Sequence, residues 1–134
     1  MSRPAKDPLD DLPQQAVRPL GDVARSDLDA WTRRTGQRLI GVEFDACTDE
    51  SEVLRAIAHA FALPSWFGMN LDALYDALTD LTDRDAASGY VVLLERLPRT
   101  GQFTRAQRDA LLDVFRDVVD SFAERGVPFR VLYS

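Results

Sequence analysis

The stretch Leu63-Pro-Ser-Trp-Phe-Gly-Met-Asn-Leu-Asp-Ala-Leu-Tyr-Asp-Ala-Leu-Thr-Asp-Leu81 decides the fold, because it predicts a rigid turn that leads directly into a helix. Pro64 fixes its own φ and disfavours helical geometry at Leu63, so a preceding helix should end there. We expect Gly68 to adopt a backbone angle that other residues resist, and Asn70 to cap the new helix. Leucines then recur at helical spacing and predict a buried face: Leu71, Leu74, Leu78 and Leu81.

Three aspartates, spaced four residues apart, share a different face of this predicted helix: Asp72, Asp76 and Asp80. Like charges at this spacing cost a helix about 0.2–0.5 kcal/mol per pair, and no basic residue of the stretch balances them. Trp66 and Phe67 precede the helix, and Tyr75 falls between two of the aspartates. Aromatic side chains anchor interfaces and charges steer partners, so the pattern favours a binding patch over the alternative, a solvated helix face.

This segment resembles the barstar family of intracellular protein inhibitors, whose target is a small secreted bacterial ribonuclease. The family pattern is an aromatic pair, Gly, one variable residue, and then Asn-x-Asp-Ala-Leu-x-Asp-x-Leu. Here the chain reads Trp-Phe-Gly-Met-Asn-Leu-Asp-Ala-Leu-Tyr-Asp-Ala-Leu from Trp66 to Leu78. A looser resemblance runs from about Leu39 to Tyr133. Met69 departs from the pattern by replacing a polar residue, and Tyr75 stands where the family has Trp.

The resemblance implies a cytoplasmic inhibitor that fills the active site of a cationic ribonuclease with an acidic helix. Asp76 matches the family's central aspartate, which enters the phosphate site, and Asp72 matches a second acidic contact. Asp109, early in a later helix, is expected to supply a further acidic contact. The remaining expected partner-binding residues belong to the turn and to the acidic face: Trp66, Phe67, Gly68, Asn70, Tyr75 and Asp80.

The rest of the chain alternates helices and strands. Three apolar runs predict strands, at residues 38–44, 90–95 and 129–133. The continuous apolar run at 90–95 is typical of a strand covered on both faces. Strands separated by helices imply parallel pairing through right-handed crossovers. We therefore expect an α/β fold with a small three-stranded parallel sheet packed with helices, the kind of fold that the barstar family has.

Helix boundaries are predicted from capping signals. Ser26 is expected to begin a short helix that ends at Gly36, and Thr48 or Asp49 to cap a second helix. Thr104 and a glutamine three residues later form a capping-box pattern that opens a long final helix, which ends at Gly126. With the predicted strands, these signals give the order helix, strand, helix, helix, strand, helix, strand.

The N-terminal region is expected to differ from the rest. Residues 1–20 contain four prolines without hydrophobic periodicity, which predicts a flexible arm. Residues 21–134 are expected to form a single barstar-like domain. Within it, residues 21–37 form an extra helical segment that the resemblance does not cover.

Composition excludes several classes of protein. The chain has 134 residues and a net charge of −6, which disfavours direct nucleic-acid binding and favours a cationic partner. No apolar stretch is long enough to span a bilayer, and no signal peptide is recognisable. The single cysteine, Cys47, suits a reducing cytosol, and His59 is the only histidine. Both are interpreted as structural or surface residues, and we expect no cofactor or metal.

Three alternatives to the ribonuclease inhibitor remain open. Asp72 and Asp76 are in principle a carboxylate pair for acid–base catalysis or a divalent metal, but no second element supplies an opposing group. We therefore expect a protein that is not an enzyme. The chain is otherwise an immunity or antitoxin module for a different basic toxin, or a regulatory module for a host nuclease or stress factor.

Overall fold

The computed structural model describes residues 8–64, 66–81 and 88–134. In chain order its elements are η1 (Pro8–Asp11), β1 (Gln15–Pro19), α1 (Arg25–Thr35), β2 (Arg38–Glu43), α2 (Glu50–Ala60), α3 (Leu71–Thr79), β3 (Tyr90–Glu95), α5 (Arg105–Glu124) and β4 (Phe129–Tyr133). The strands form one parallel sheet in the order β1-β4-β3-β2. The expected α/β class with a parallel sheet is confirmed, but the sheet has four strands rather than three.

The fourth strand comes from the region that we expected to be an arm. Gln15 is paired with Phe129, and the register continues to Pro19 opposite Tyr133. The expectation of a flexible arm is therefore wrong for residues 8–19, which contain a 3-10 helix and an edge strand, while residues 1–7 lie outside the described part of the chain. Proline is tolerated here because an edge strand leaves one side of its backbone unpaired.

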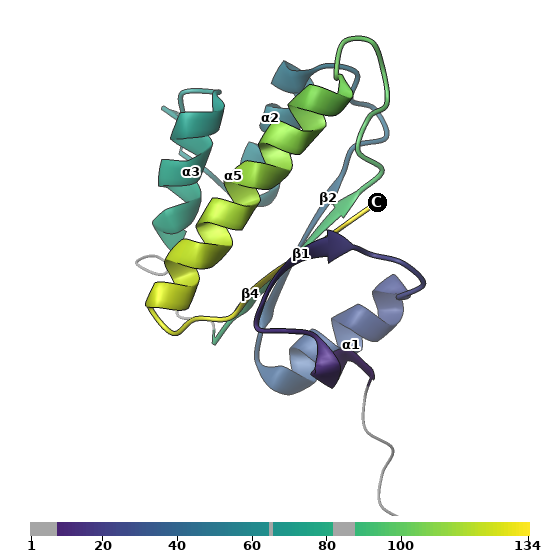
Figure 1. The fold of residues 1–134 in the computed structure, drawn as a ribbon, viewed down its shortest axis with the longest axis vertical. Helices are drawn as coiled ribbons and strands as arrows, with labels where there is room; N and C mark the ends of the chain where they lie inside the picture. Colours follow the sequence, from purple (N-terminus) through teal and green to yellow (C-terminus); the bar gives the residue numbers. More distant parts are fainter. Residues whose placement is uncertain (1–7, 65, 82–87) are drawn as a thin grey trace, which may run out of the picture.

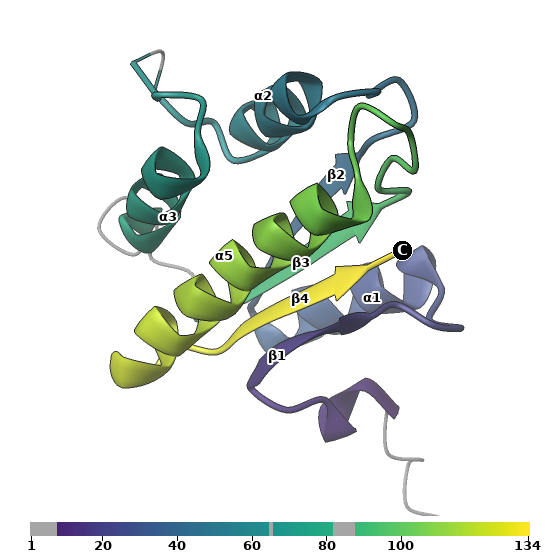
Figure 2. The ribbon, with the colours of Figure 1, turned by 45° about the horizontal axis from the view of Figure 1, so that its top comes forward.

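The two faces of the sheet are covered by different parts of the chain (Figure 2). Helices α2, α3 and α5 cover one face, where Tyr90, Val92 and Leu94 of β3 enter the main core. Helix α1 and η1 cover the other face, where Val91 and Leu93 meet a smaller cluster formed by Leu9, Leu28, Trp31 and Leu132. Both faces of β3 are buried, so side chains pointing to either face must be apolar, and this explains the continuous apolar run of its sequence.

Helix starts follow the predicted caps in three of four cases. The Asn70 side chain accepts a hydrogen bond from the Ala73 N–H at 2.8 Å, and Asp49 accepts one from the Glu52 N–H at 2.9 Å. Thr104 forms a complete capping box with its partner three residues later. The prediction for Ser26 is wrong: α1 begins one residue earlier, its N-cap is Ala24, and no side chain caps it.

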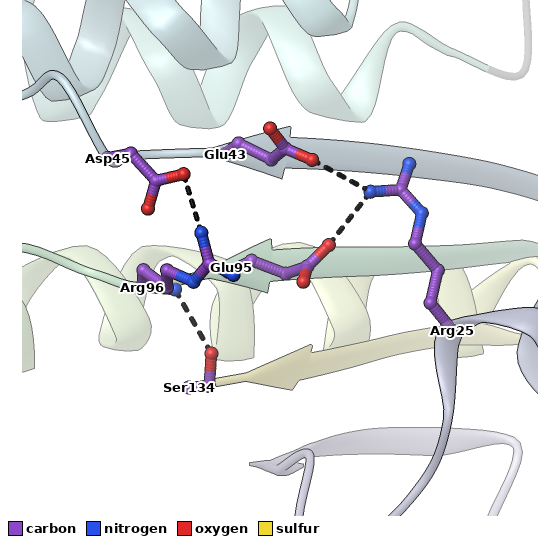
Figure 3. Close-up of polar contacts among 6 residues, drawn as sticks. All are labelled: Arg25, Glu43, Asp45, Glu95, Arg96 and Ser134. Atoms are coloured by element: carbon purple, nitrogen blue, oxygen red, sulfur yellow. Dashed lines mark hydrogen bonds and ion pairs between the residues drawn. The ribbon is translucent and has the colours of Figure 1, made fainter.

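Ion pairs hold α1 against the carboxyl ends of the strands (Figure 3). Arg25 Nη1 donates to Glu43 Oε1 at 3.1 Å and to Glu95 Oε1 at 2.9 Å, so the start of α1 is bonded to β2 and β3. Arg96 Nη1 donates to Asp45 Oδ2 at 2.7 Å, and its backbone N–H donates to Ser134 Oγ. The end of the chain is thereby fixed beside β3.

Arg130 of β4 fixes the N-terminal segment. It is buried, and its guanidinium donates to the carbonyl oxygens of Pro13 and Leu12 and to Gln37 Oε1. The same guanidinium lies 5.1 Å from the centre of the Trp31 ring, whose Nε1 donates to Asp10. Burial lowers the pKa of Arg130, but an arginine remains charged at neutral pH. Among the described residues, no helix is both long and apolar enough to cross a membrane.

Candidate functional site

The turn before α3 divides its two aromatic residues between the core and the solvent. Phe67 is only 8% exposed and belongs to the main core, whereas Trp66 is 78% exposed. The Phe67 N–H donates to the Pro64 carbonyl at 3.0 Å, which closes the turn. The positive φ falls on Met69, at 50°, and not on Gly68, so our expectation for Gly68 is wrong.

Asn70 connects this turn to the helix. Its Oδ1 caps α3, and its Nδ2 donates to the Gly68 carbonyl at 3.1 Å. The side-chain amide therefore fixes the angle at which the turn enters the helix. Leu74 and Leu78 are fully buried, as their spacing predicts, and α3 turns its acidic side away from the core.

Helices α3 and α5 lie side by side (Figure 1), and a groove of about 550 Å³ runs between them. Asp72, Tyr75 and Asp76 line it from α3, together with Leu71. The opposite wall is formed by five residues of α5: Val114, Asp117, Asp120, Ser121 and Glu124. Both walls of the groove are thus acidic, and the lining also contains the apolar side chains of Leu71 and Val114.

Some of the predicted residues lie outside this groove. Asp80 is the C-cap of α3 and is exposed, and Asp109 is exposed near the start of α5. Neither lines the groove, and Trp66 and Phe67 do not line it either. The structure therefore brings together Asp72, Tyr75 and Asp76, with the turn adjoining them at the start of the helix.

Three acidic residues of the groove were missed by sequence reasoning: Asp117, Asp120 and Glu124. Their signal was available, because α5 has no acidic residue in its first turn and no basic residue in its last turn. A helix is stabilised by the opposite arrangement, since its C-terminal end carries partial negative charge. Glu124 lies in the last turn of α5, against the helix dipole, and therefore calls for an explanation other than helix stability.

Within residues 8–64, 66–81 and 88–134, no group of three or more His, Cys, Asp or Glu side chains is arranged to hold a metal ion. Cys47 lies outside the groove, and burial, followed by the charges of Glu52 and Asp49, raises the pKa of its thiol. A raised pKa disfavours the reactive thiolate. His59 is exposed on α2.

The family comparison covers this whole region. The family model described as Barstar (barnase inhibitor) matches residues 37–134, which include both groove helices and the turn before α3. Residues 1–36, with η1, β1 and α1, precede the match. No curated protein matches this chain.

Proposed function

Because the chain belongs to the Barstar (barnase inhibitor) family, we propose that it inhibits a small cationic ribonuclease by placing the acidic groove between α3 and α5 over the enzyme's active site. The family is one of inhibitors rather than enzymes, and its members bind a protein partner. The proposal adds the mode of binding and the residues that carry it.

The observation that carries this proposal is the set of five carboxylates on the two walls of the groove, whose lining also includes Leu71, Tyr75 and Val114. A ribonuclease holds the phosphates of RNA with cationic side chains. A protein surface that offers carboxylates at the same positions competes with the substrate for those cations. Apolar groups among the carboxylates exclude water, which strengthens the charge pairs.

Each predicted residue has a role in this mechanism. Asp76 enters the phosphate site, Asp72 forms a second charge pair, and Tyr75 packs against the enzyme. Trp66 is the exposed anchor beside the groove. Phe67, Gly68 and Asn70 act by holding the turn in place, since Phe67 is buried and Asn70 caps α3.

Asp80 and Asp109 have a weaker role. Both are exposed and stand away from the groove lining. Charges at the rim of an interface change the association rate and its dependence on salt more than they change the dissociation rate. We place Asp80 and Asp109 in this class, and propose that the α5 contacts come from the three carboxylates that line the groove, Asp117, Asp120 and Glu124. The inhibitor acts in the cytoplasm, where an active ribonuclease would degrade the cell's own RNA.

The test is calorimetric titration of the protein with barnase at two salt concentrations. We expect 1:1 binding that weakens as salt rises, because the complementary charges are screened. Asp76→Ala should cost about 2–5 kcal/mol, since it leaves the enzyme's cations buried without a partner. Asp22→Ala is the matched control: it removes the same charge from an exposed turn between β1 and α1, and it should leave the affinity unchanged.

Two results would reject parts of the proposal. Equal losses in Asp76→Ala and in Asp22→Ala would show that net charge, and not the groove, drives binding. A folded protein that does not bind barnase would exclude this type of target. The alternative would then be an immunity, antitoxin or regulatory module for another basic protein, to be sought by affinity capture with Asp76→Ala as the negative control.

A further inference from the structure

The C-terminal ends of α3 and α5 are joined by one arginine. Arg125 is the C-cap of α5, and its Nη1 donates to the carbonyl oxygen of Thr79, the last residue of α3, at 2.7 Å. Its Nη2 donates to Ser121 Oγ at 3.3 Å. The guanidinium also lies 5.0 Å from the centre of the Phe122 ring. One planar group thus contacts the end of α3, a residue that lines the groove, and the core.

Phe122 gives this contact a rigid base. Its ring is fully buried and packs on Tyr90 and Phe129, with ring centres 5.5 and 4.8 Å away. Both aromatic partners belong to the sheet. The position of the guanidinium is therefore set by the core, and the carbonyl of Thr79 is held relative to it.

The carboxylates on the two walls of the groove repel each other and so act against the contact between α3 and α5. Asp117, Asp120 and Glu124 face Asp72 and Asp76 across the groove. Neither α3 nor α5 has a basic residue in its last described turn. Two walls of like charge repel one another, and the negative ends of two helix dipoles add to the repulsion. Arg125 is a cation at the place where the two helix ends meet.

From these contacts we infer that Arg125 is a positioning residue for partner binding: it holds α3 against α5 and so sets the width of the acidic groove. This inference rests on the proposed function, because it concerns how the same groove is prepared for a cationic partner. If the two helices are already held at the separation that the partner requires, binding costs less conformational entropy. The affinity for the partner is higher for that reason.

A positioning role for Arg125 predicts a change in partner affinity opposite to the change that net charge alone predicts. Replacing Arg125 makes the protein more negative, which by long-range attraction alone should favour a cationic partner. If Arg125 positions the groove, affinity should fall in spite of the added negative charge. Arg116→Ala is the matched control, since Arg116 is on the same helix, is exposed, and among the described residues forms an ion pair with its near neighbour Asp113 at 2.7 Å.

The experiment compares barnase binding by Arg125→Ala, Arg125→Lys and Arg116→Ala. We expect binding about tenfold weaker in Arg125→Ala and affinity unchanged or slightly higher in Arg116→Ala. Arg125→Lys should restore part of the loss, because an ammonium group can bond the Thr79 carbonyl but lacks the second arm that reaches Ser121. Affinity in Arg125→Ala equal to or above that of Arg116→Ala would overturn the inference.

Hydrogen exchange gives a second readout that needs no partner. Loss of the hydrogen bond from Arg125 to Thr79 should make the backbone amides of α3 exchange about tenfold faster in Arg125→Ala than in Arg116→Ala. The amides of α2 and β3 should exchange at the same rates in both variants. Equal exchange of α3 in the two variants would overturn the inference whether or not barnase binds. Absence of barnase binding by the unchanged protein would reject only the proposed target, and exchange would still decide the role of Arg125.

Discussion

Trp66 and Phe67 are neighbours in the chain but belong to different environments. The turn directs Phe67 into the core and leaves Trp66 exposed to solvent. A large aromatic side chain that is exposed to solvent contributes little to the stability of the monomer. At an interface the same side chain contributes a large contact area and has few rotatable bonds to immobilise. The two residues should therefore respond to mutation in opposite ways.

We predict that Trp66→Ala weakens barnase binding by about 2 kcal/mol or more and leaves the urea midpoint unchanged. Phe67→Ala should lower the free energy of unfolding by about 3 kcal/mol, because it leaves a cavity in the core. Calorimetry and urea unfolding measure the two effects. Loss of stability in Trp66→Ala without loss of affinity would contradict the role of Trp66 as an anchor.

Glu52 provides a pH-dependent contribution to stability. Its carboxylate accepts hydrogen bonds from Thr48 Oγ1 at 2.6 Å and from the Thr48 N–H at 3.1 Å, and these bonds lower the pKa of Glu52. A carboxyl group whose pKa is lower in the folded state stabilises the protein above its unfolded-state pKa. That contribution is lost as pH falls through the folded-state pKa.

We predict that the difference in urea midpoint between the unchanged protein and Glu52→Gln is largest near neutral pH and disappears in acid. The glutamine retains an acceptor for Thr48 but does not titrate, so the comparison isolates the charge. Urea unfolding of both proteins from neutral pH downwards measures this. A difference that stays constant as pH falls would contradict the assignment.

At the scale of the element, α5 has two roles that conflict. Its apolar face packs over the sheet with Leu111, Phe115, Val118 and Phe122 fully or almost fully buried. Its other face places Asp117, Asp120 and Glu124 along the groove, and Glu124 lies in the last turn, where the helix dipole disfavours negative charge. We interpret these carboxylates as retained for binding at some cost in stability.

We predict that Asp120→Asn and Glu124→Gln both weaken barnase binding, and that Glu124→Gln also raises the free energy of unfolding by about 0.3–1 kcal/mol. Asp113→Asn is the control, because Asp113 is exposed in the middle of the helix and does not line the groove. Urea unfolding and calorimetry of the three variants provide the comparison. Variants that lose stability would show that these carboxylates serve the helix instead of the partner.

At the scale of the whole molecule, the segment before the family match completes the fold. Leu9, Leu28 and Trp31 cover the face of the sheet that carries Val91 and Leu93. Strand β1 pairs with β4, which would otherwise be an edge. Residues 8–36 are therefore part of the folded domain, although they do not line the groove.

We predict that a variant reduced to residues 37–134 loses more than about 3 kcal/mol of stability, because the apolar side chains of the second face become exposed. It should also self-associate, since a continuous apolar face and an unpaired β4 edge are both exposed. Urea unfolding and sedimentation velocity test this prediction. A monomeric fragment with an unchanged urea midpoint would show that the segment is dispensable.

The sequence alone determined the features that depend on residues close together in the chain. Capping by Asn70, Asp49 and Thr104 involves backbone groups three positions away, and the buried faces of the helices follow from their period. The α/β class, the parallel strands and the acidic wall of α3 were predicted on this basis. Two wrong predictions also concern neighbouring residues: α1 is capped at Ala24 and does not begin at Ser26, and the positive φ falls on Met69 instead of Gly68. Several residues close together in the chain can fill the same place in a turn or cap.

Only the tertiary structure decided the features that join distant residues. The pairing of Gln15 with Phe129 supplies the fourth strand, and nothing local to a proline-rich segment indicates a partner so far along the chain. The second wall of the groove depends on which side of α5 packs beside α3. Asp117 and Asp109 are both acidic residues of one helix, and the packing of that helix places Asp117, but not Asp109, in the lining of the groove.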